Sequence, residues 1–260
     1  MGCRSDAPRA GAKKKDIVLD GANGEDNSFA RNLAPIFEAL SGNFSGDLDG
    51  GITSGGGTLV VRVRNLGPGV AYNGLSVDGL GALGDEQNPP TSFGGYAWRP
   101  LANQLTSSAG TGDALVASSP GKVAYTAGNV LVAQEIKDMT LPLVAFSGAA
   151  LMVPIHDARL IASLSPDHQA IISGRAAGVI PVVALSNAFR NLAGKISPSL
   201  CSGSALDGVI AQIEGASDMM ANGTQDGAAT CDGVSFGIGL QGLASGVGAS
   251  APLDTTVSCP

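Results

Sequence analysis

The residues best suited to catalysis are few: two histidines, His156 and His168, and one serine, Ser235, in the pattern GVSFG. A GxSxG nucleophile requires a strand before the serine and a helix after it. The stretch after Ser235, FGIGLQGLASGVG, has no helical stripe of apolar residues. His156 stands beside Asp157 where the apolar alternation slips, which indicates a β-bulge. We therefore expect no enzyme, and a secreted hydrolase using Ser235 or His156 is the alternative.

Side-chain oxygens recur in a glycine-rich stretch near the start, at Asp20, Asn23, Asp26 and Asn27. Ca²⁺ takes about six to eight oxygen ligands, and loops of this kind supply them, so calcium is the one cofactor that the sequence suggests. The stretch lacks the bidentate glutamate that closes an EF-hand loop. The alternative, which we favour, is that Asp26 and Asn27 cap the helix that follows.

Two aromatic residues, Tyr96 and Trp98, fall on one face of an expected strand because side chains alternate along a strand. Such a pair can form a small platform for a ligand. The alternative, which we favour, is that both rings cover the core, since aromatic side chains bury large apolar areas.

Charge excludes one class of partner. The net charge is -7 and the pI is near 4.7, whereas nucleic-acid binding needs clustered lysines and arginines. The basic run Lys13–Lys15 lies in the N-terminal tail. We therefore expect no nucleic-acid partner.

The start of the chain and its cysteines indicate a compartment. Met1-Gly2-Cys3 resembles the end of a bacterial lipobox, so we expect Cys3 to be lipidated and residues 1–15 to form an anchor and flexible tether. Arg4 then favours the outer membrane. The alternative is a cytosolic protein in which Cys3 is incidental. With Cys3 lipidated, Cys201 and Cys231 form the natural pair, and Cys259 is either free or paired with a Cys3 that carries no lipid.

The clearest structural signal is a hairpin, in which two β-rich runs flank Ser165-Pro166-Asp167-His168, a type I turn sequence. Helices are expected over 28–40, 181–194 and 204–221, and residues 41–57 are expected to form a loop. Strands are expected over 58–66, 70–83, 96–98, 115–117, 122–127, 129–133, 141–146 and 234–243. This order predicts one mainly β domain over residues 16–260, a β-sandwich or jelly-roll-like fold with flanking α-helices.

Several stretches are similar to a group of uncharacterised secreted lipoproteins found in myxobacteria and their relatives. They are LDGANGEDNSFARNLAPI, GGTLVVRVRNL, the hairpin LMVPIHDARLIASLSPDHQAIISGRAAGVIPV, and the block from SPSLCSGSALDG to CDGVSFGIGLQG. The resemblance covers most of the chain after residue 16. It implies an extracytoplasmic, lipid-anchored protein with a Cys201–Cys231 bridge, and it implies no reaction.

These observations predict a non-enzymatic lipoprotein of the cell envelope whose sandwich domain binds a surface ligand or a partner. A folded domain on a tether is a common layout for such proteins. Besides the hydrolase, one further alternative is a structural subunit that associates with itself through exposed strand edges.

Overall fold

The computed structural model describes residues 3–4, 27–85, 87–145, 149–253 and 258–259. The helices are α1 (Ala34–Ser41), α2 (Phe44–Thr53), α3 (Val182–Ile196) and α4 (Ser204–Gly215), with a π-helical turn at Phe29–Leu33. The strands are β1 (Thr58–Arg64), β2 (Tyr72–Asn73), β3 (Ser76–Leu83), β4 (Ala97–Pro100), β5 (Leu105–Ser107), β6 (Val116–Ala117), β7 (Val123–Ala127), β8 (Val130–Ala145), β9 (Ala149–Leu164), β10 (Ala170–Pro181), β11 (Gly233–Leu243) and β12 (Gly246–Val247). The expected mainly β fold with flanking helices is confirmed.

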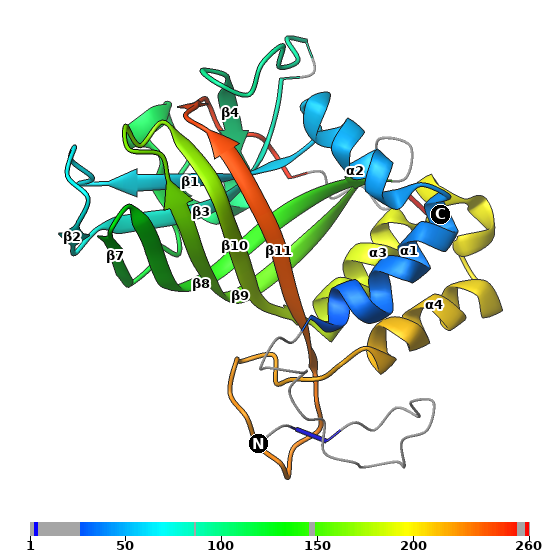
Figure 1. Cartoon of the computed structure of the whole chain (residues 1–260). Helices are drawn as coiled ribbons and strands as arrows, with labels where there is room; N and C mark the ends of the chain where they lie inside the picture. Colours follow the sequence, from blue (N-terminus) through cyan, green and yellow to red (C-terminus); the bar gives the residue numbers. More distant parts are fainter. Residues whose placement is uncertain (1–2, 5–26, 86, 146–148, 254–257, 260) are drawn as a thin grey trace.

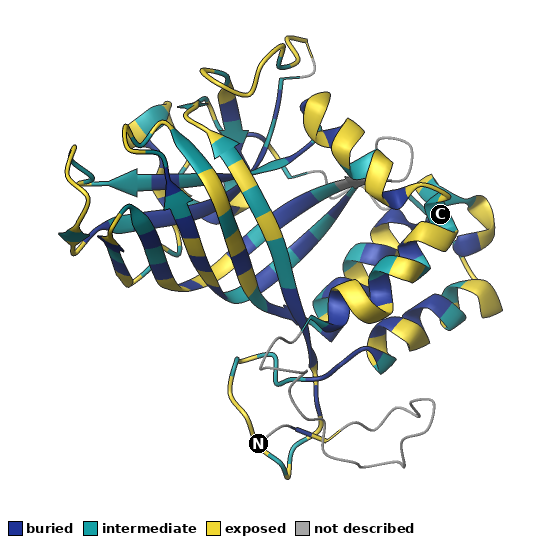
Figure 2. Cartoon of the chain, viewed as in Figure 1, coloured by how far each residue is buried: buried dark blue, intermediate teal, exposed yellow. Residues whose placement is uncertain are grey.

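The largest sheet has the order β11-β10-β9-β8-β7-β2, in which the strands from β7 to β10 lie beside their neighbours along the chain. It curls strongly, and the four helices gather at one end of it (Figure 1). The long strands of this sheet place apolar residues at every second position, because a strand that buries only one face alternates apolar and polar residues. Figure 2 shows the resulting alternation of buried and exposed positions.

The predicted hairpin is present as β9 and β10. The turn between them is closed by the His168 N–H, which donates to the Ser165 carbonyl at 2.9 Å. The predicted bulge near His156 is also present. Asp157 has a left-handed backbone (φ 48°), and the pairing of β9 with β10 shifts register beside it. A matching irregularity occurs in β8 at Glu135 (φ 56°), so the sheet bends at this level.

A second sheet, β1-β3-β4-β12, faces the curled sheet and is joined to it along β3. The Leu75 N–H donates to the Ala124 carbonyl at 3.0 Å, and the Gly121 N–H donates to the Val77 carbonyl at 2.7 Å. The buried Gln104 makes the third link: its Oε1 accepts from the N–H groups of Gly81 and Thr140 at 3.1 and 2.9 Å.

The Gln104 Nε2 also donates to the Gly81 carbonyl at 3.0 Å, so one amide bonds β3 and β8 three times. β1 pairs with β3 alone among the described strands, as β11 pairs with β10 alone. The two sheets are therefore bonded along β3, and the chain after β11 returns to the second sheet, where β12 pairs with β4. The edge strands are β1 and β12 in one sheet and β11 and β2 in the other.

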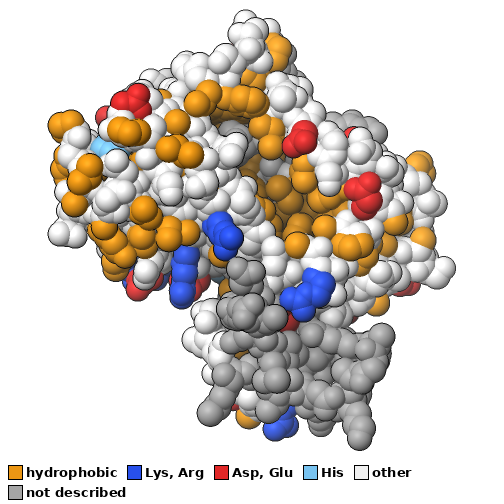
Figure 3. Space-filling view, viewed as in Figure 1, with side chains coloured by type: hydrophobic (Ala, Val, Ile, Leu, Met, Phe, Trp, Pro, Cys, Tyr) orange, Lys and Arg blue, Asp and Glu red, His pale blue; other side chains and the backbone are white. Residues whose placement is uncertain are grey.

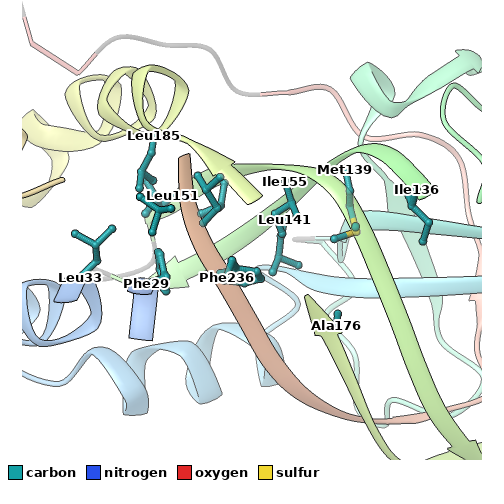
Figure 4. Packing of buried hydrophobic residues seen from close by; sticks show 14 of the residues in the cluster. Phe29, Leu33, Ile136, Met139, Leu141, Leu151, Ile155, Ala176, Leu185 and Phe236 are labelled. Atoms are coloured by element: carbon teal, nitrogen blue, oxygen red, sulfur yellow. The ribbon is translucent and has the colours of Figure 1, made fainter. Parts of the chain in front are cut away.

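One apolar core runs from the helices into the concave side of the curled sheet. At the helical end, Phe29 packs edge-on against Phe236, and Phe37 stacks on Phe189. Figure 4 shows the core continuing from Phe29, Leu33 and Leu185 through Leu151 and Ile155 to Met139, Ile136 and Ala176. The far face of β1 and β3 covers a smaller cluster around Trp98.

Two expectations about helices are wrong. Residues 44–53 form α2 and not a loop, although three glycines lower their helix propensity, because Phe44 and Leu48 pack against the core. α4 ends at Gly215 and not at residue 221, because Ala216, Ser217 and Asp218 turn into the protein, where each is almost completely buried.

Candidate ligand-binding site

An apolar crevice lies between the two sheets, with β1 and β3 on one side and β8, β9 and β10 on the other. It is lined by Leu59, Val61, Gly79, Ile136, Met139, Ala158, Arg159, Leu160 and Ala176. Arg159, the one charged member, is 65% exposed and its guanidinium lies 3.2 Å from Asp157 Oδ2. The crevice holds about 10 Å³, about the room of one water. Its lining can therefore offer contact and shape to a ligand but almost no hydrogen bonds.

Strand register extends the apolar lining to the edge strand β11. Ala176 is paired with Leu160 on one side and with Ile238 on the other, and paired residues point to the same face of a sheet. Ile238 and Leu240 are partly buried against the core, as are Leu59 and Val61 of β1. Figure 3 shows a hydrophobic hollow between the curled sheet and the helices, whereas the residues that line the crevice all come from strands.

Ser235 of the GxSxG pattern is a structural residue in a buried polar network. Its Oγ donates to Asp218 Oδ2 at 2.6 Å, and its own N–H donates to Asp218 Oδ1 at 2.8 Å. The Ser28 N–H donates to Ser235 Oγ at 2.7 Å, and Ser28 Oγ donates to the Ala216 carbonyl. The network joins β11 to the end of α4 and to the start of the first helix. The Ser235 hydroxyl is thus fully engaged and 3% exposed.

His156 lies on the outer face of the curled sheet and pairs with Asp138. Its Nε2 is 3.5 Å from Asp138 Oδ1, and both side chains are substantially exposed. Val179 is the cross-strand partner of His156 on one side and of Ser235 on the other. His156 and Ser235 are therefore two strand spacings apart, about 10 Å, with Val179 between them. The histidine cannot take a proton from the serine at that separation.

Tyr96 and Trp98 do not form an open platform. Trp98 is 3% exposed in the smaller core cluster, Phe93 stacks over its face with ring centroids 6.2 Å apart, and Tyr96 meets its edge at 5.0 Å. The Tyr96 hydroxyl accepts from the Asp85 N–H and donates to the Asn88 carbonyl. Trp98 is therefore a core residue and Tyr96 is partly buried beside it, and the ligand role of the pair stays a prediction.

The predicted calcium site falls mostly outside the described residues, which is where Asp20, Asn23 and Asp26 lie. Asn27 is described. Its Oδ1 accepts from the Ala30 N–H at 3.1 Å and its Nδ2 donates to the Gly237 carbonyl at 2.8 Å, so it serves as a helix cap tied to β11. Among the described residues, no group of three or more histidine, cysteine, aspartate or glutamate side chains is placed to hold a metal.

The cysteine pairing differs from the expected one. Cys3 is bonded to Cys231, and Cys201 is bonded to Cys259, so the expected Cys201–Cys231 bridge is wrong. Cys201 and Cys231, which flank α4, are each bonded to a cysteine near one end of the chain and not to each other. Register explains the first pair, because Arg4 forms a parallel bridge with Thr230 and the Cys231 N–H donates to the Arg4 carbonyl at 2.7 Å.

The same pairing corrects the expected lipidation of Cys3, since a sulfur in a disulfide cannot also carry a thioether-linked lipid. Cys3 and Cys231 are 1% and 5% exposed. Two disulfides indicate an oxidising, extracytoplasmic environment. None of the helices in the described ranges is long and apolar enough to cross a membrane.

Comparisons with protein-family models, with curated proteins and with solved structures each give no match to this chain. The site is therefore argued from its own geometry.

Sequence reasoning missed the crevice and Gln104. The one available signal for the crevice is the set of small residues on one face of β10, since Gly174, Ala176 and Gly178 alternate with residues of the other face. Alternation identifies the inward face but not the strand that will lie opposite. Gln104 gives no signal at all, because its partners Gly81 and Thr140 are far from it in the chain.

Proposed function

We propose that this protein is an extracytoplasmic, non-enzymatic binding module whose ligand is apolar and enters the crevice between the two sheets. The observation that carries the proposal is the lining. Eight of its nine residues are apolar or glycine, and they come from five different strands. Ligand sites in proteins are mostly apolar and lie between packed elements, which is the setting of this crevice.

The competing hydrolase receives no support from the two residues on which it depended. Ser235 is buried with its hydroxyl bonded to a carboxylate, and His156 lies across Val179 from it. General esterase and glycosidase substrates remain the direct test of this alternative, with Ser235→Ala and His156→Ala as the matched variants. Turnover that disappears in either variant would restore the hydrolase.

Anchoring of the protein in an outer membrane is part of the original expectation and depends on Cys3. A disulfide and a lipid at this sulfur exclude each other, so the mass of the N-terminal peptide decides between them. We expect the non-reduced digest to contain Cys3 linked to Cys231. A diacylglyceryl-modified Cys3 in material extracted from membranes would instead support the anchor.

The crevice is tested with two leucine substitutions on one strand. Ala176 faces the crevice and is 4% exposed, whereas its neighbour Ala177 is exposed on the outer face. Ala176→Leu adds three heavy atoms to the crevice, and Ala177→Leu adds the same atoms to the surface. We expect the neutral apolar dye phenylnaphthylamine to bind the unmodified protein and Ala177→Leu, and to bind Ala176→Leu at least tenfold more weakly.

Overpacking at Ala176 costs about 1–3 kcal/mol of stability, so a gentler variant is needed. Gly79→Ala adds one methyl group, which would lie 3.1 Å from Met139 Sδ and 3.4 Å from Ile136 Cδ1, both at ends of flexible side chains. We expect it to fold and to bind the dye more weakly than the unmodified protein. Equal dye binding by all three variants would show that the dye lies elsewhere and would refute the crevice as the site.

A further inference from the structure

We propose that the open edge of β11 binds an extended peptide of another protein, which adds one strand to the curled sheet beside Gly239 and Gln241. The peptide carries apolar side chains at alternate positions and no charge along the paired segment. This goes beyond the proposed function, because it concerns the edge of β11 and not the crevice between the sheets.

β11 pairs with β10 and with no other described strand. Backbone groups of an antiparallel strand alternate between its two sides, so every second residue turns its N–H and C=O away from β10. The Ser235 N–H and the Gly237 carbonyl both bond to groups outside β10, so the odd-numbered residues face the open side. Gly239 and Gln241 continue this alternation, because the register shift in the pair adds its extra residue to β10.

The first part of this edge is completed by side chains. The Asp218 carboxylate accepts from the Ser235 N–H at 2.8 Å, and the Asn27 amide donates to the Gly237 carbonyl at 2.8 Å. These two groups take the places of the acceptor and the donor that a neighbouring strand would offer. No described residue bonds to the next two outward-facing residues on this side, so two donors and two acceptors remain open there.

The edge of β11 lacks the features that keep strands from pairing. Edge strands in natural proteins are protected by being short or by carrying charged residues or proline. The strands β2, β5, β6 and β12 have two or three residues each, and β1 carries Arg62 and Arg64. β11 has 11 residues, of which none is charged and none is proline. Among the described strands, β11 therefore has the edge best suited to accept a further strand.

Glycine leaves the outer face of this edge open to a second backbone. Gly237 and Gly239 occupy successive outer-face positions, and a Cβ placed on Gly239 would meet no atom within 4 Å. Glycine inside a strand often marks a place where another backbone approaches closely. An added strand beside Gly239 would therefore meet no side chain of β11 at that position.

The inner face of the edge favours apolar side chains in the peptide. β10 lies on one side of β11, and the helices lie toward the other (Figure 1). Figure 3 shows a hydrophobic hollow between the curled sheet and the helices. Ile238 and Leu240 face inward and are only partly buried. Because side chains alternate along a strand, every second side chain of the peptide would extend this apolar surface.

A peptide of another protein fits this edge better than a second copy of the chain does. Backbone donors and acceptors that recur at every second residue match an extended backbone, as in recognition by strand addition. Two copies of the chain would each bring a net charge of -7, and their repulsion opposes association. An uncharged peptide segment meets no such repulsion.

The probe is a short fluorescein-labelled peptide in which valine alternates with threonine, with a lysine at each end for solubility. One control peptide has the same residues in scrambled order, and the other carries N-methyl groups on its backbone amides, which removes its donors. Binding to the full chain with both disulfides intact is measured by fluorescence anisotropy. Because four backbone hydrogen bonds are at stake, we expect the probe to bind at least about tenfold more tightly than either control.

Two substitutions at one position test the edge itself. Gln241→Pro removes the outward N–H and places a ring where the added strand would lie, and edge strands tolerate proline. Gln241→Ala keeps the backbone and is the matched control. We expect Gln241→Pro to bind the probe at least about tenfold more weakly and Gln241→Ala to bind it as the unmodified protein does. The control peptides need no variant, so they decide the question if Gln241→Pro does not fold.

Amide exchange at single residues tests the geometry of binding. We expect the probe to slow exchange at Gly239 and Gln241, whose N–H groups face it. Exchange at Ile238 and Leu240 should not change, because their N–H groups already face β10. Protection at every second residue is the signature of an added strand, and a change of stability alone would not produce it.

Several results would overturn the inference. Equal binding of the probe and its control peptides, or unchanged exchange at Gly239 and Gln241, would refute strand addition. A dimer of the protein in sedimentation that Gln241→Pro converts to a monomer would make a second copy the occupant and would refute the peptide. None of these results bears on the crevice, which phenylnaphthylamine tests separately.

Discussion

Gln104 offers the sharpest test of how the two sheets are held together. The side chain is 4% exposed and makes three hydrogen bonds, two to Gly81 and one to Thr140. Gln104→Leu removes all three and keeps a similar volume. Each bond contributes about 1 kcal/mol net, and the backbone groups left behind lose their partners inside the protein. We therefore expect a loss of about 3 kcal/mol or more in the free energy of unfolding.

The assay is urea unfolding followed by the fluorescence of Trp98, the single tryptophan of the chain, which is almost completely buried. Asn103→Ala is the matched control. Asn103 precedes Gln104, is exposed, and makes one bond, from its Nδ2 to Thr140 Oγ1 at 3.2 Å. A surface change of this kind should stay within about 0.5 kcal/mol. The m-value should be unchanged in both variants, because the folded state keeps its surface.

A small effect would contradict the reasoning. If Gln104→Leu loses less than about 1 kcal/mol, the amide does not hold β3 to β8. If the loss of stability is large but phenylnaphthylamine binds more slowly, the Gln104 amide is needed to form the crevice and does not merely hold the two sheets together. The expected result is a large loss of stability with dye entry at least as fast as before.

Three further perturbations test other parts of the structure. Ser235→Ala removes a hydroxyl donor from the buried carboxylate of Asp218, and it should lower the free energy of unfolding in urea by about 1.5–3 kcal/mol. No change in that free energy would mean that water reaches the Asp218 carboxylate and replaces the hydroxyl. Asp78→Asn removes the carboxylate whose Oδ2 lies 2.7 Å from the buried Arg62 guanidinium, and it should lower the free energy of unfolding by about 3–5 kcal/mol. A more stable variant would mean that the cost of desolvating the two charges exceeds their mutual attraction. A hydrogen bond from the Ser165 hydroxyl lowers the pKa of the Asp167 carboxyl. The ionised Asp167 carboxylate therefore contributes to stability at pH values above the ordinary carboxyl pKa, and this contribution is lost as the pH falls through the lowered pKa. NMR titration of that carboxyl should give a value below the ordinary range, and an ordinary value would mean that the hydroxyl bond is absent in solution.

The sequence predicted those features that depend on residues close together in the chain. The hairpin follows from two alternating runs and a turn sequence, and the bulge at Asp157 follows from the slip in that alternation. The strand 58–66 was expected to place Leu59 and Val61 on the face opposite Arg62, and they do face the main core. In each case the deciding residues are neighbours in the chain, so the sequence displays them together.

Contacts between distant segments decided the rest. The cysteine pairs join residues 228 and 58 positions apart, and nothing in their spacing favours one partner over another. The helix α2 forms because Phe44 reaches the core and because the Phe44 N–H donates to Glu38 Oε2 at 2.8 Å. The carboxylate partner of Ser235, Asp218, was expected inside a helix and lies just beyond the end of one.

The two disulfides lie at the helical end and at the base of β11, away from the sheet that contains β1 and β3. One disulfide joins the start of the chain to Cys231, two residues before β11, and the other joins the end of the chain to Cys201, between α3 and α4. In the chain-entropy relation they contribute about 5 and about 4 kcal/mol, and all of this stabilises the helical end and the base of β11. β1 and β3 carry no cysteine. Because local opening concentrates where stability is lowest, amide exchange without ligand should be faster in β1 than in β9 and β10, and equal protection of β1 would mean that the two sheets open only when the whole protein unfolds.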